Sequence, residues 1–122
     1  MESEDQVSLL TEALREFADE RDWNQFHTPK NLAMALSVEA SELVEIFQWL
    51  TPEESCDLPP AKLKQAREEL ADVFIYLIRT ADRLSIDIVE AAWEKHRDNK
   101  AKYPADKVRG SAAKYTEHQI DE

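Results

Sequence analysis

Two pairs of acidic residues have the types and the spacing of a metal site. Glu39 and Glu42 are three positions apart, and so are Glu69 and Asp72. Side chains three positions apart share a helix face, so each pair presents two carboxylates in one direction. If the two helices pack antiparallel, four carboxylates converge, and they repel one another unless protons or a cation compensate. Oxygen ligands without cysteine or histidine favour Mg²⁺, with Mn²⁺ as a possible substitute.

Two other interpretations of these carboxylates are a solvated acidic surface and a di-iron site. Acidic pairs are common on solvated helix faces, particularly in a chain with 26 acidic and 15 basic residues. Against this, Glu39 interrupts an apolar stripe and Asp72 directly precedes the apolar segment 73–78, where charge is costly. A di-iron carboxylate bundle requires E-x-x-H. No glutamate lies three positions before any of the histidines, which excludes that motif.

Helices are the elements that must position the carboxylates. Apolar periodicity predicts helices over residues 3–22, 29–50, 61–84 and 88–102. Ser3, Thr28 followed by Pro29, and Asp87 are the expected helix starts. Prolines in residues 51–60 predict a loop, and the residues after Pro104 lack periodicity and predict a tail. The sequence therefore predicts an all-α, four-helix bundle with a short C-terminal tail.

The third predicted helix is the central one. Residues 73–78 are apolar around almost the whole circumference, so several sides need cover from other helices or from another subunit. Trp93, at helical spacing from Val89 and His96, is interpreted as a core residue. His27 is expected to satisfy backbone groups at a helix start. The central helix thus predicts an oligomer.

Composition narrows the possible functions. The 122 residues, 43% of them hydrophobic, predict one domain over 1–122, with its tail beginning near residue 105. A single glycine, Gly110, leaves no material for a glycine-rich phosphate loop. The net charge of -11 disfavours duplex DNA and anionic membranes as partners. An acidic start, no long apolar run and one cysteine, Cys56, favour a cytoplasmic protein.

Several segments resemble one family of enzymes. E-x-x-E followed by E-x-x-D is similar to the signature of the all-α, MazG-like nucleoside triphosphate pyrophosphohydrolases. Further motifs resemble the dCTP pyrophosphatase branch of that group: Glu20-Arg21-Asp22-Trp23, Phe26-His27-x-Pro29-Lys30-Asn31, Phe47-Gln48-Trp49, Lys102-Tyr103-Pro104 and Lys114-Tyr115-Thr116-Glu117. The similarity covers about residues 17–117.

The resemblance implies roles for particular residues. The implied Mg²⁺ ligands, and with them the catalytic centre, are Glu39, Glu42, Glu69 and Asp72. Trp23 and Trp49 would flank the base, and Tyr76 and Asn99 would line the nucleotide pocket. Candidate phosphate contacts are Lys30, Lys102 and Lys114, the last on a tail that would close over the triphosphate. Without the resemblance, packing is the favoured interpretation of both tryptophans, and Tyr76 could belong to the core.

The implied activity is Mg²⁺-dependent cleavage of (deoxy)nucleoside triphosphates to monophosphate and pyrophosphate. Pyrimidine substrates, dCTP first, a homotetramer and a house-cleaning role in the nucleotide pool are expected from the same resemblance. One position departs from the pattern: some relatives carry a histidine on the first helix near the base, where this chain has Leu14. The base preference therefore stays open. The alternative function is a non-catalytic helical module that binds a nucleotide or a protein.

Overall fold

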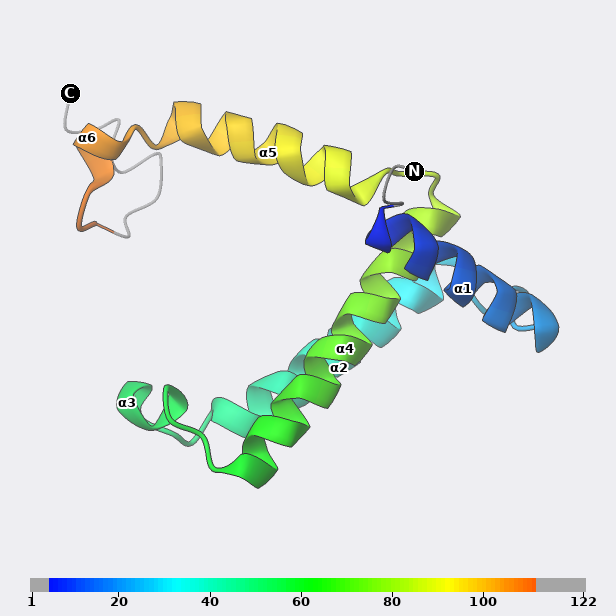
Figure 1. Ribbon diagram of the computed structural model, residues 1–122, viewed down its shortest axis with the longest axis horizontal. Coiled ribbons are helices and arrows are strands. Elements are labelled where there is room, and N and C mark those ends of the chain that lie inside the picture. The colour runs from blue at the N-terminus through cyan, green and yellow to red at the C-terminus, as the bar shows by residue number, and fades with distance from the viewer. Residues whose placement is uncertain (1–4, 112–122) are drawn as a thin grey trace. The chain divides into compact units, whose positions relative to one another are not determined.

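The computed structural model describes residues 5–111, which form six helices (Figure 1). They are α1 (Gln6–Glu20), α2 (Pro29–Phe47), α3 (Pro52–Ser55), α4 (Pro60–Arg83), α5 (Ile88–Lys102) and α6 (Ala105–Val108). No strand occurs in this range, so the predicted all-α class is confirmed. The chain divides into two compact units, whose described parts are residues 5–86 and 87–111. Within 5–111, no helix combines the length and apolarity that crossing a membrane requires.

Helix starts follow the predicted capping signals in two of three cases. The side chains of Thr28 and Asp87 each accept a hydrogen bond from the backbone N–H three residues further on. The first helix differs, because Asp5 is its N-cap and accepts from Val7 N–H at 3.1 Å. The predicted cap, Ser3, lies outside the described residues. The helix therefore begins at Gln6, later than its apolar periodicity alone suggested.

Two short helices lie in segments that the sequence predicted to be irregular. In the predicted loop, Thr51 and Glu54 form a capping box around α3, with Thr51 N–H donating to the Glu54 carboxylate at 2.9 Å. In the predicted tail, α6 begins directly after Pro104. Pro52 occupies the first turn of α3, where proline favours a helix because its missing N–H needs no partner. The prolines that predicted a break in the chain thus also begin new helices.

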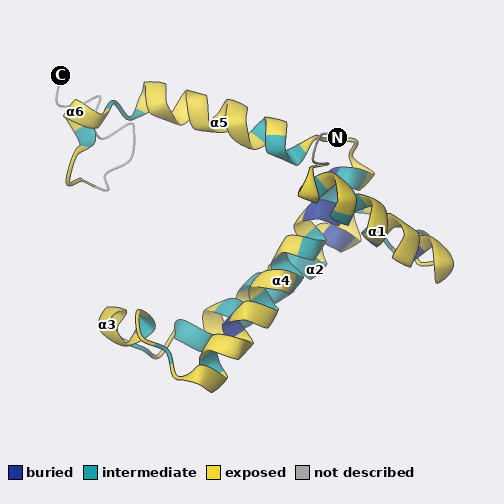
Figure 2. Cartoon of the chain, in the orientation of Figure 1, coloured by how far each residue is buried: buried dark blue, intermediate teal, exposed yellow. Residues whose placement is uncertain are grey.

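The antiparallel helices α2 and α4 form the framework of the first unit, and α1 packs against α4 (Figure 1). Packing among these three helices buries Ala18, Leu32, Ala66, Ile78 and Ala81, and buried residues are dark blue in Figure 2. Three of these are alanines, whose small side chains let helix backbones approach closely. The close α2–α4 packing fixes which residues of the two helices face each other.

Cover of the central helix α4 is incomplete in the described chain. Ile78 is fully buried, whereas Phe74 is 44% and Leu77 is 36% exposed. The sequence predicted that residues 73–78 need cover on several sides, and α1 and α2 supply only part of it. Exposed apolar side chains on one helix face are typical of an interaction surface.

Trp93 is not a core residue in the described chain. It lies on α5, where it is 60% exposed and contacts His96 edge-on, with ring centroids 6.0 Å apart. The described part of its unit is two helices, and α5 has no buried residue. The prediction was wrong because helical spacing places Trp93 on a face without showing what packs on that face.

Candidate functional site

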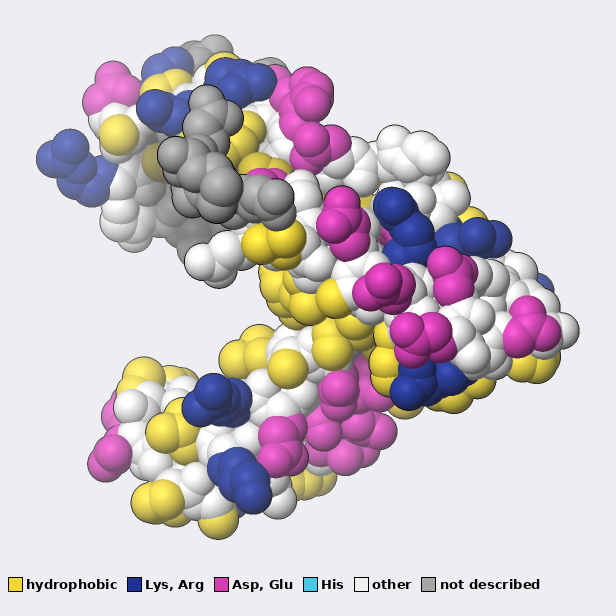
Figure 3. All heavy atoms as spheres, turned by 45° about the vertical axis from the view of Figure 1, so that its right-hand side comes forward, with side chains coloured by type: hydrophobic (Ala, Val, Ile, Leu, Met, Phe, Trp, Pro, Cys, Tyr) yellow, Lys and Arg dark blue, Asp and Glu magenta, His cyan; other side chains and the backbone are white. Residues whose placement is uncertain are grey.

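Three of the four predicted metal ligands come together between α2 and α4. Glu39 from α2 and Glu69 and Asp72 from α4 each offer a carboxylate oxygen, and these oxygens lie within 4.8 Å of one another. The antiparallel packing brings the middle of α2 opposite the middle of α4, which is why pairs distant in sequence meet. Figure 3 shows acidic side chains gathered on this hairpin, beside hydrophobic ones. Three oxygens at this spacing could hold one metal ion.

The electrostatics of the cluster favour a bound cation. One oxygen of Glu39 and one of Glu69 are buried without a hydrogen-bond partner in the described part of the chain. Burial, followed by hydrogen bonding with Glu42 and Glu69, raises the pKa of Glu39 to about 7. Burial is also the largest cause of the raised pKa of Glu69. Buried, unpaired oxygens are costly by themselves, so this donor set fits a hard divalent cation.

Glu42 borders the cluster from an open groove. The groove has a volume of about 630 Å³, and its lining includes Glu42, Glu69, Glu45, Glu68 and the basic Lys62. Glu42 also acts on the pKa of both Glu39 and Glu69, so its carboxyl group is their direct neighbour. All four predicted carboxylates therefore lie in one place, three in the tight cluster and Glu42 at its edge.

An apolar cavity of about 230 Å³ lies further along α4. Its walls are Leu14, Phe17, Trp23, His27, Ile75, Tyr76 and Arg79. Trp23 packs edge-on against Phe17, with ring centroids 5.5 Å apart. Tyr76 follows Asp72 by one helical turn, about 6 Å along the axis. The cavity thus adjoins the carboxylate cluster, and two residues predicted to contact the nucleotide, Trp23 and Tyr76, lie in its wall.

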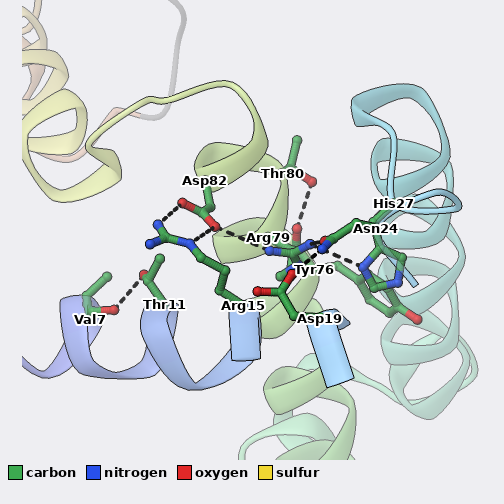
Figure 4. Close-up of polar contacts among 10 residues, drawn as sticks. All are labelled: Val7, Thr11, Arg15, Asp19, Asn24, His27, Tyr76, Arg79, Thr80 and Asp82. Carbon is green, nitrogen blue, oxygen red and sulfur yellow. Dashed lines mark hydrogen bonds and ion pairs between the residues drawn. The ribbon is translucent and has the colours of Figure 1, made fainter. Parts of the chain in front are cut away.

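A buried arginine connects this cavity to an ion-pair network (Figure 4). Arg79 is 3% exposed, and its Nη1 donates to Asp82 at 3.2 Å. Asp82 also accepts two hydrogen bonds from Arg15, at 2.6 and 3.2 Å, which ties α1 to α4. Sharing Asp82 between two guanidinium groups holds the C-terminal end of α4 against α1.

The structure separates Trp49 from the cavity. Trp49 is 87% exposed just beyond the C-terminal end of α2, whereas Trp23 precedes the N-terminal end. The 19 residues of α2 span about 28 Å. Both tryptophans of one chain therefore do not line the same described cavity. Lys30 is exposed in the first turn of α2, near the Trp23 end.

The remaining predicted contacts lie in the second unit or beyond it. Asn99 and Lys102 are exposed on α5. Lys114, with its K-Y-T-E segment, lies outside the described residues. For these three residues the predicted nucleotide and phosphate contacts stay predictions.

Sequence reasoning missed the polar residues of the apolar cavity. Arg79 follows Ile75 by four positions and Tyr76 by three, so helical spacing already places its charge on their face. His27 was expected to satisfy backbone groups at a helix start. Instead its Nδ1 lies 3.4 Å from Nη2 of Arg79. The signal for Arg79 was a charge at the end of the apolar segment 73–78, and no comparable signal marked His27.

Comparison with known proteins places the chain in a family. A sequence profile of the MazG-like family matches residues 34–117. dCTP pyrophosphatase 1 from Mus musculus and from Homo sapiens are each 46% identical over 104 residues, 84% of this chain. A crystal structure of a pyrophosphatase from Archaeoglobus fulgidus DSM 4304 superposes with a TM-score of 0.79 and 40% identity, covering 85% of this chain and 97% of that chain. The chain belongs to the MazG-like family, as the resemblance predicted.

The two mammalian proteins are longer than the region they share with this chain. The matched region spans 61% of the length of each. The archaeal pyrophosphatase, by contrast, is matched over nearly its whole chain.

Proposed function

We propose that this chain hydrolyses (deoxy)nucleoside triphosphates between the α and β phosphates, releasing a monophosphate and pyrophosphate. Pyrimidine deoxynucleotides, dCTP first, are the proposed substrates, and removal of unwanted nucleotides from the pool is the proposed role. The observation that carries the proposal is the carboxylate cluster between α2 and α4, with an apolar cavity further along α4. The names of the relatives, dCTP pyrophosphatase 1 and a pyrophosphatase, support the same reaction class.

Mg²⁺ is the proposed metal, held by Glu39, Glu69 and Asp72 with Glu42 beside them. When bound, it supplies positive charge that offsets the triphosphate and polarises the phosphoryl oxygens. The chain needs such charge, because its own formal net charge is -11. Carboxylates are hydrogen-bond acceptors when ionised, so one glutamate not engaged by the metal can take a proton from the attacking water.

The apolar cavity is the proposed site of the base. A volume of about 230 Å³ is below the roughly 300–1,000 Å³ of sites that enclose a drug-sized ligand, so it suits one part of a nucleotide. Aromatic walls favour a flat, apolar group, and a nucleobase meets that requirement. With the base against Trp23 and Tyr76, the phosphates would extend along α4 toward Asp72.

Trp49 would act through a second copy of the chain. The length of α2 separates Trp49 from Trp23, so the two residues of a single chain cannot contact the same base. In the proposed tetramer, Trp49 of one protomer would reach the base pocket of another. Lys30, Lys102 and Lys114 remain the proposed phosphate contacts, and Asn99 a proposed pocket residue.

Pyrophosphate release from a panel of deoxynucleoside triphosphates tests the function. The full chain with Mg²⁺ is expected to yield equal amounts of pyrophosphate and monophosphate, with dCTP among the best substrates. EDTA and the Glu69→Gln variant are expected to abolish release. Absence of pyrophosphate from every substrate, with Mg²⁺ and with Mn²⁺, would overturn the proposal.

The alternative is a non-catalytic module that binds a nucleotide or a protein. It predicts nucleotide binding by calorimetry without product formation. The same panel therefore separates the two functions, because only the enzyme converts bound triphosphate to monophosphate.

A further inference from the structure

Arg79 is a buried charge in the wall of the apolar cavity. It is 3% exposed, and most of the cavity lining around it is apolar or aromatic. A buried arginine is costly unless its N–H groups are satisfied. Asp82 supplies the neighbouring negative charge, 3.2 Å from Nη1. Arg15, on the exposed side, is the residue that ties α1 to Asp82, whereas Arg79 lies on α4 itself.

The hydrogen bonds of Arg79 do not use all of its N–H donors. Nη1 donates to Asp82, and Nη2 donates to Asn24 Oδ1 at 3.0 Å and lies 3.4 Å from His27 Nδ1 (Figure 4). Nε is buried and has no partner among the described residues. Three neighbours thus hold the guanidinium group and use three of its five N–H donors, while the Nε–H and one N–H of Nη1 are left over.

The contact with Arg79 also leaves His27 with a hydrogen-bond donor for a ligand. A guanidinium group only donates, so His27 Nδ1, facing Nη2, is the acceptor in this contact. The neutral ring then carries its hydrogen on Nε2. Burial and the charge of Arg79 lower the pKa of His27, which keeps the ring neutral. Both side chains therefore suit a ligand whose edge carries hydrogen-bond acceptors.

We propose that Arg79 is a specificity-determining residue, which donates a hydrogen bond from its guanidinium group to an acceptor atom on the edge of the nucleobase. Ring nitrogen and carbonyl oxygen atoms of pyrimidines are such acceptors. Trp23 and Tyr76 select a flat ring and tolerate any base, since stacking is insensitive to the pattern of polar atoms. Arg79 adds the discrimination that stacking lacks, because an unpaired buried donor penalises a base without an acceptor. This inference rests on the proposed base site.

The test compares two substrates in the wild-type chain and in the Arg79→Met variant. dTTP carries carbonyl acceptors, and the triphosphate of 2,4-difluorotoluene deoxynucleoside has nearly the same shape without strong acceptors. The wild-type chain is expected to prefer dTTP in kcat/KM by about tenfold to a hundredfold, the range expected for a hydrogen bond to a charged group. Arg79→Met is expected to lower this preference to about twofold or less, chiefly through the loss of dTTP hydrolysis.

Arg15→Met is the matched control. Arg15 binds the same carboxylate as Arg79, but it lies outside the cavity lining, and its side chain is 54% exposed. This variant is expected to lower the melting temperature while retaining the preference for dTTP. If Arg79→Met does not fold, Arg79→Lys replaces it, because lysine keeps the charge near Asp82 but lacks the Nε–H and the planar fork. A collapsed preference in the variant that folds supports the proposal.

An unchanged ratio between the two substrates in the Arg79 variant would overturn the proposal, as would an equal collapse in Arg15→Met. Calorimetry with the two monophosphates keeps this outcome separate from failure of the proposed hydrolysis. If the wild type binds the thymine monophosphate more tightly than its isostere and Arg79→Met does not, Arg79 selects the base even in a chain that hydrolyses nothing. Equal affinity of the wild type for both monophosphates would overturn it.

Discussion

Glu39 places a carboxyl group where the fold leaves one of its oxygens buried and unpaired. Its carboxyl group lies among Glu42, Glu69 and Asp72, all of the same sign. Such an arrangement disfavours ionisation, and it becomes favourable only when a cation is bound. At the residue scale, the carboxylates of the metal-free protein therefore repel one another. Each of them is expected to support activity and to lower the stability of the metal-free fold.

Glu39→Gln, Glu42→Gln, Glu69→Gln and Asp72→Asn are each expected to reduce turnover by about a hundredfold or more, because each removes a negative oxygen from the metal site. Pyrophosphate release at saturating Mg²⁺ measures the effect. Glu53→Gln, on the exposed helix α3, is the control and should keep the wild-type rate. Near-normal rates in any two of the four variants would contradict the assignment.

In EDTA, Glu39→Gln is expected to melt at the same or a higher temperature than the wild type. The folded-state pKa of Glu39 is about 7, above its usual 4.5, so ionising it costs stability as pH rises between these values. The gain should therefore be small at pH 4.5 and larger at pH 8. A gain that is larger in acid, measured by calorimetric melting, would contradict this explanation.

Trp23→Ala is expected to weaken nucleotide binding by about 1–3 kcal/mol for several bases, because stacking does not depend on base identity. Trp49→Ala should have a similar effect if a second copy supplies that residue to the pocket. Titration calorimetry measures both, and Trp93→Ala, another exposed tryptophan, is the control. If both variants only lower the melting temperature and leave KM unchanged, these residues serve packing and the base binds elsewhere.

At the scale of elements, the α2–α4 hairpin positions the carboxylates and α1 closes the base cavity. The hairpin is held by buried apolar residues, among them Leu32 and Ile78. The position of α1 also depends on polar contacts, since Arg15 reaches across to Asp82. The carboxylate site and the base site thus rely on different interactions, and they should respond differently to pH.

Asp82→Asn is expected to lower the free energy of unfolding at pH 7 by about 1–3 kcal/mol, because it removes a half-buried charge that pairs with Arg15 and Arg79. The hydrogen bond from Arg15 is the largest cause that holds the pKa of Asp82 below its usual 3.8. Its contribution is therefore complete above about pH 3.8 and lost as pH falls through the lower folded-state pKa.

Denaturant unfolding of the wild type and Asp82→Asn at pH 7 and below pH 3 measures this effect. The difference should shrink in acid, and Asp98→Asn, on the exposed face of α5, should show no difference at either pH. A difference between the wild type and Asp82→Asn that stays constant across this range would contradict the ion-pair explanation.

At the scale of the whole molecule, exposed apolar residues on α4 suggest a missing neighbour. Leu70, Phe74 and Leu77 are 55%, 44% and 36% exposed, respectively. The same chain has many acidic groups that favour solubility, so this apolar face stands out. A second copy would cover it and would also bring Trp49 of one chain near another.

The chain is expected to be a tetramer, with a mass near four times 14.1 kDa at micromolar concentration. Light scattering coupled to gel filtration measures it. Phe74→Glu should shift the mass downward, because a charge at a buried contact is unfavourable. Leu9→Glu, at a comparably exposed position on α1, should not shift it. A wild-type mass near 14.1 kDa would refute the assembly.

Local signals in the sequence predicted the four long helices and singled out the paired carboxylates as candidates. Thr28 with Pro29 and Asp87 specify helix starts through hydrogen bonds to residues three positions away, so no distant contact is needed. The positions of Glu39 and Asp72 beside apolar residues also made them candidates before any packing was known. Such signals can be read from the sequence alone, because helix geometry fixes which residues three or four positions apart share a face.

The tertiary structure alone decided which side chains from distant segments meet. The burial of Arg79 among Asn24, His27 and Asp82 depends on how the connector before α2 folds over α4. The separation of Trp23 from Trp49 depends on the straight run of α2 between them. A sequence states which face a side chain occupies, whereas the packing of one helix on another determines what that face contacts and whether its charge is paired.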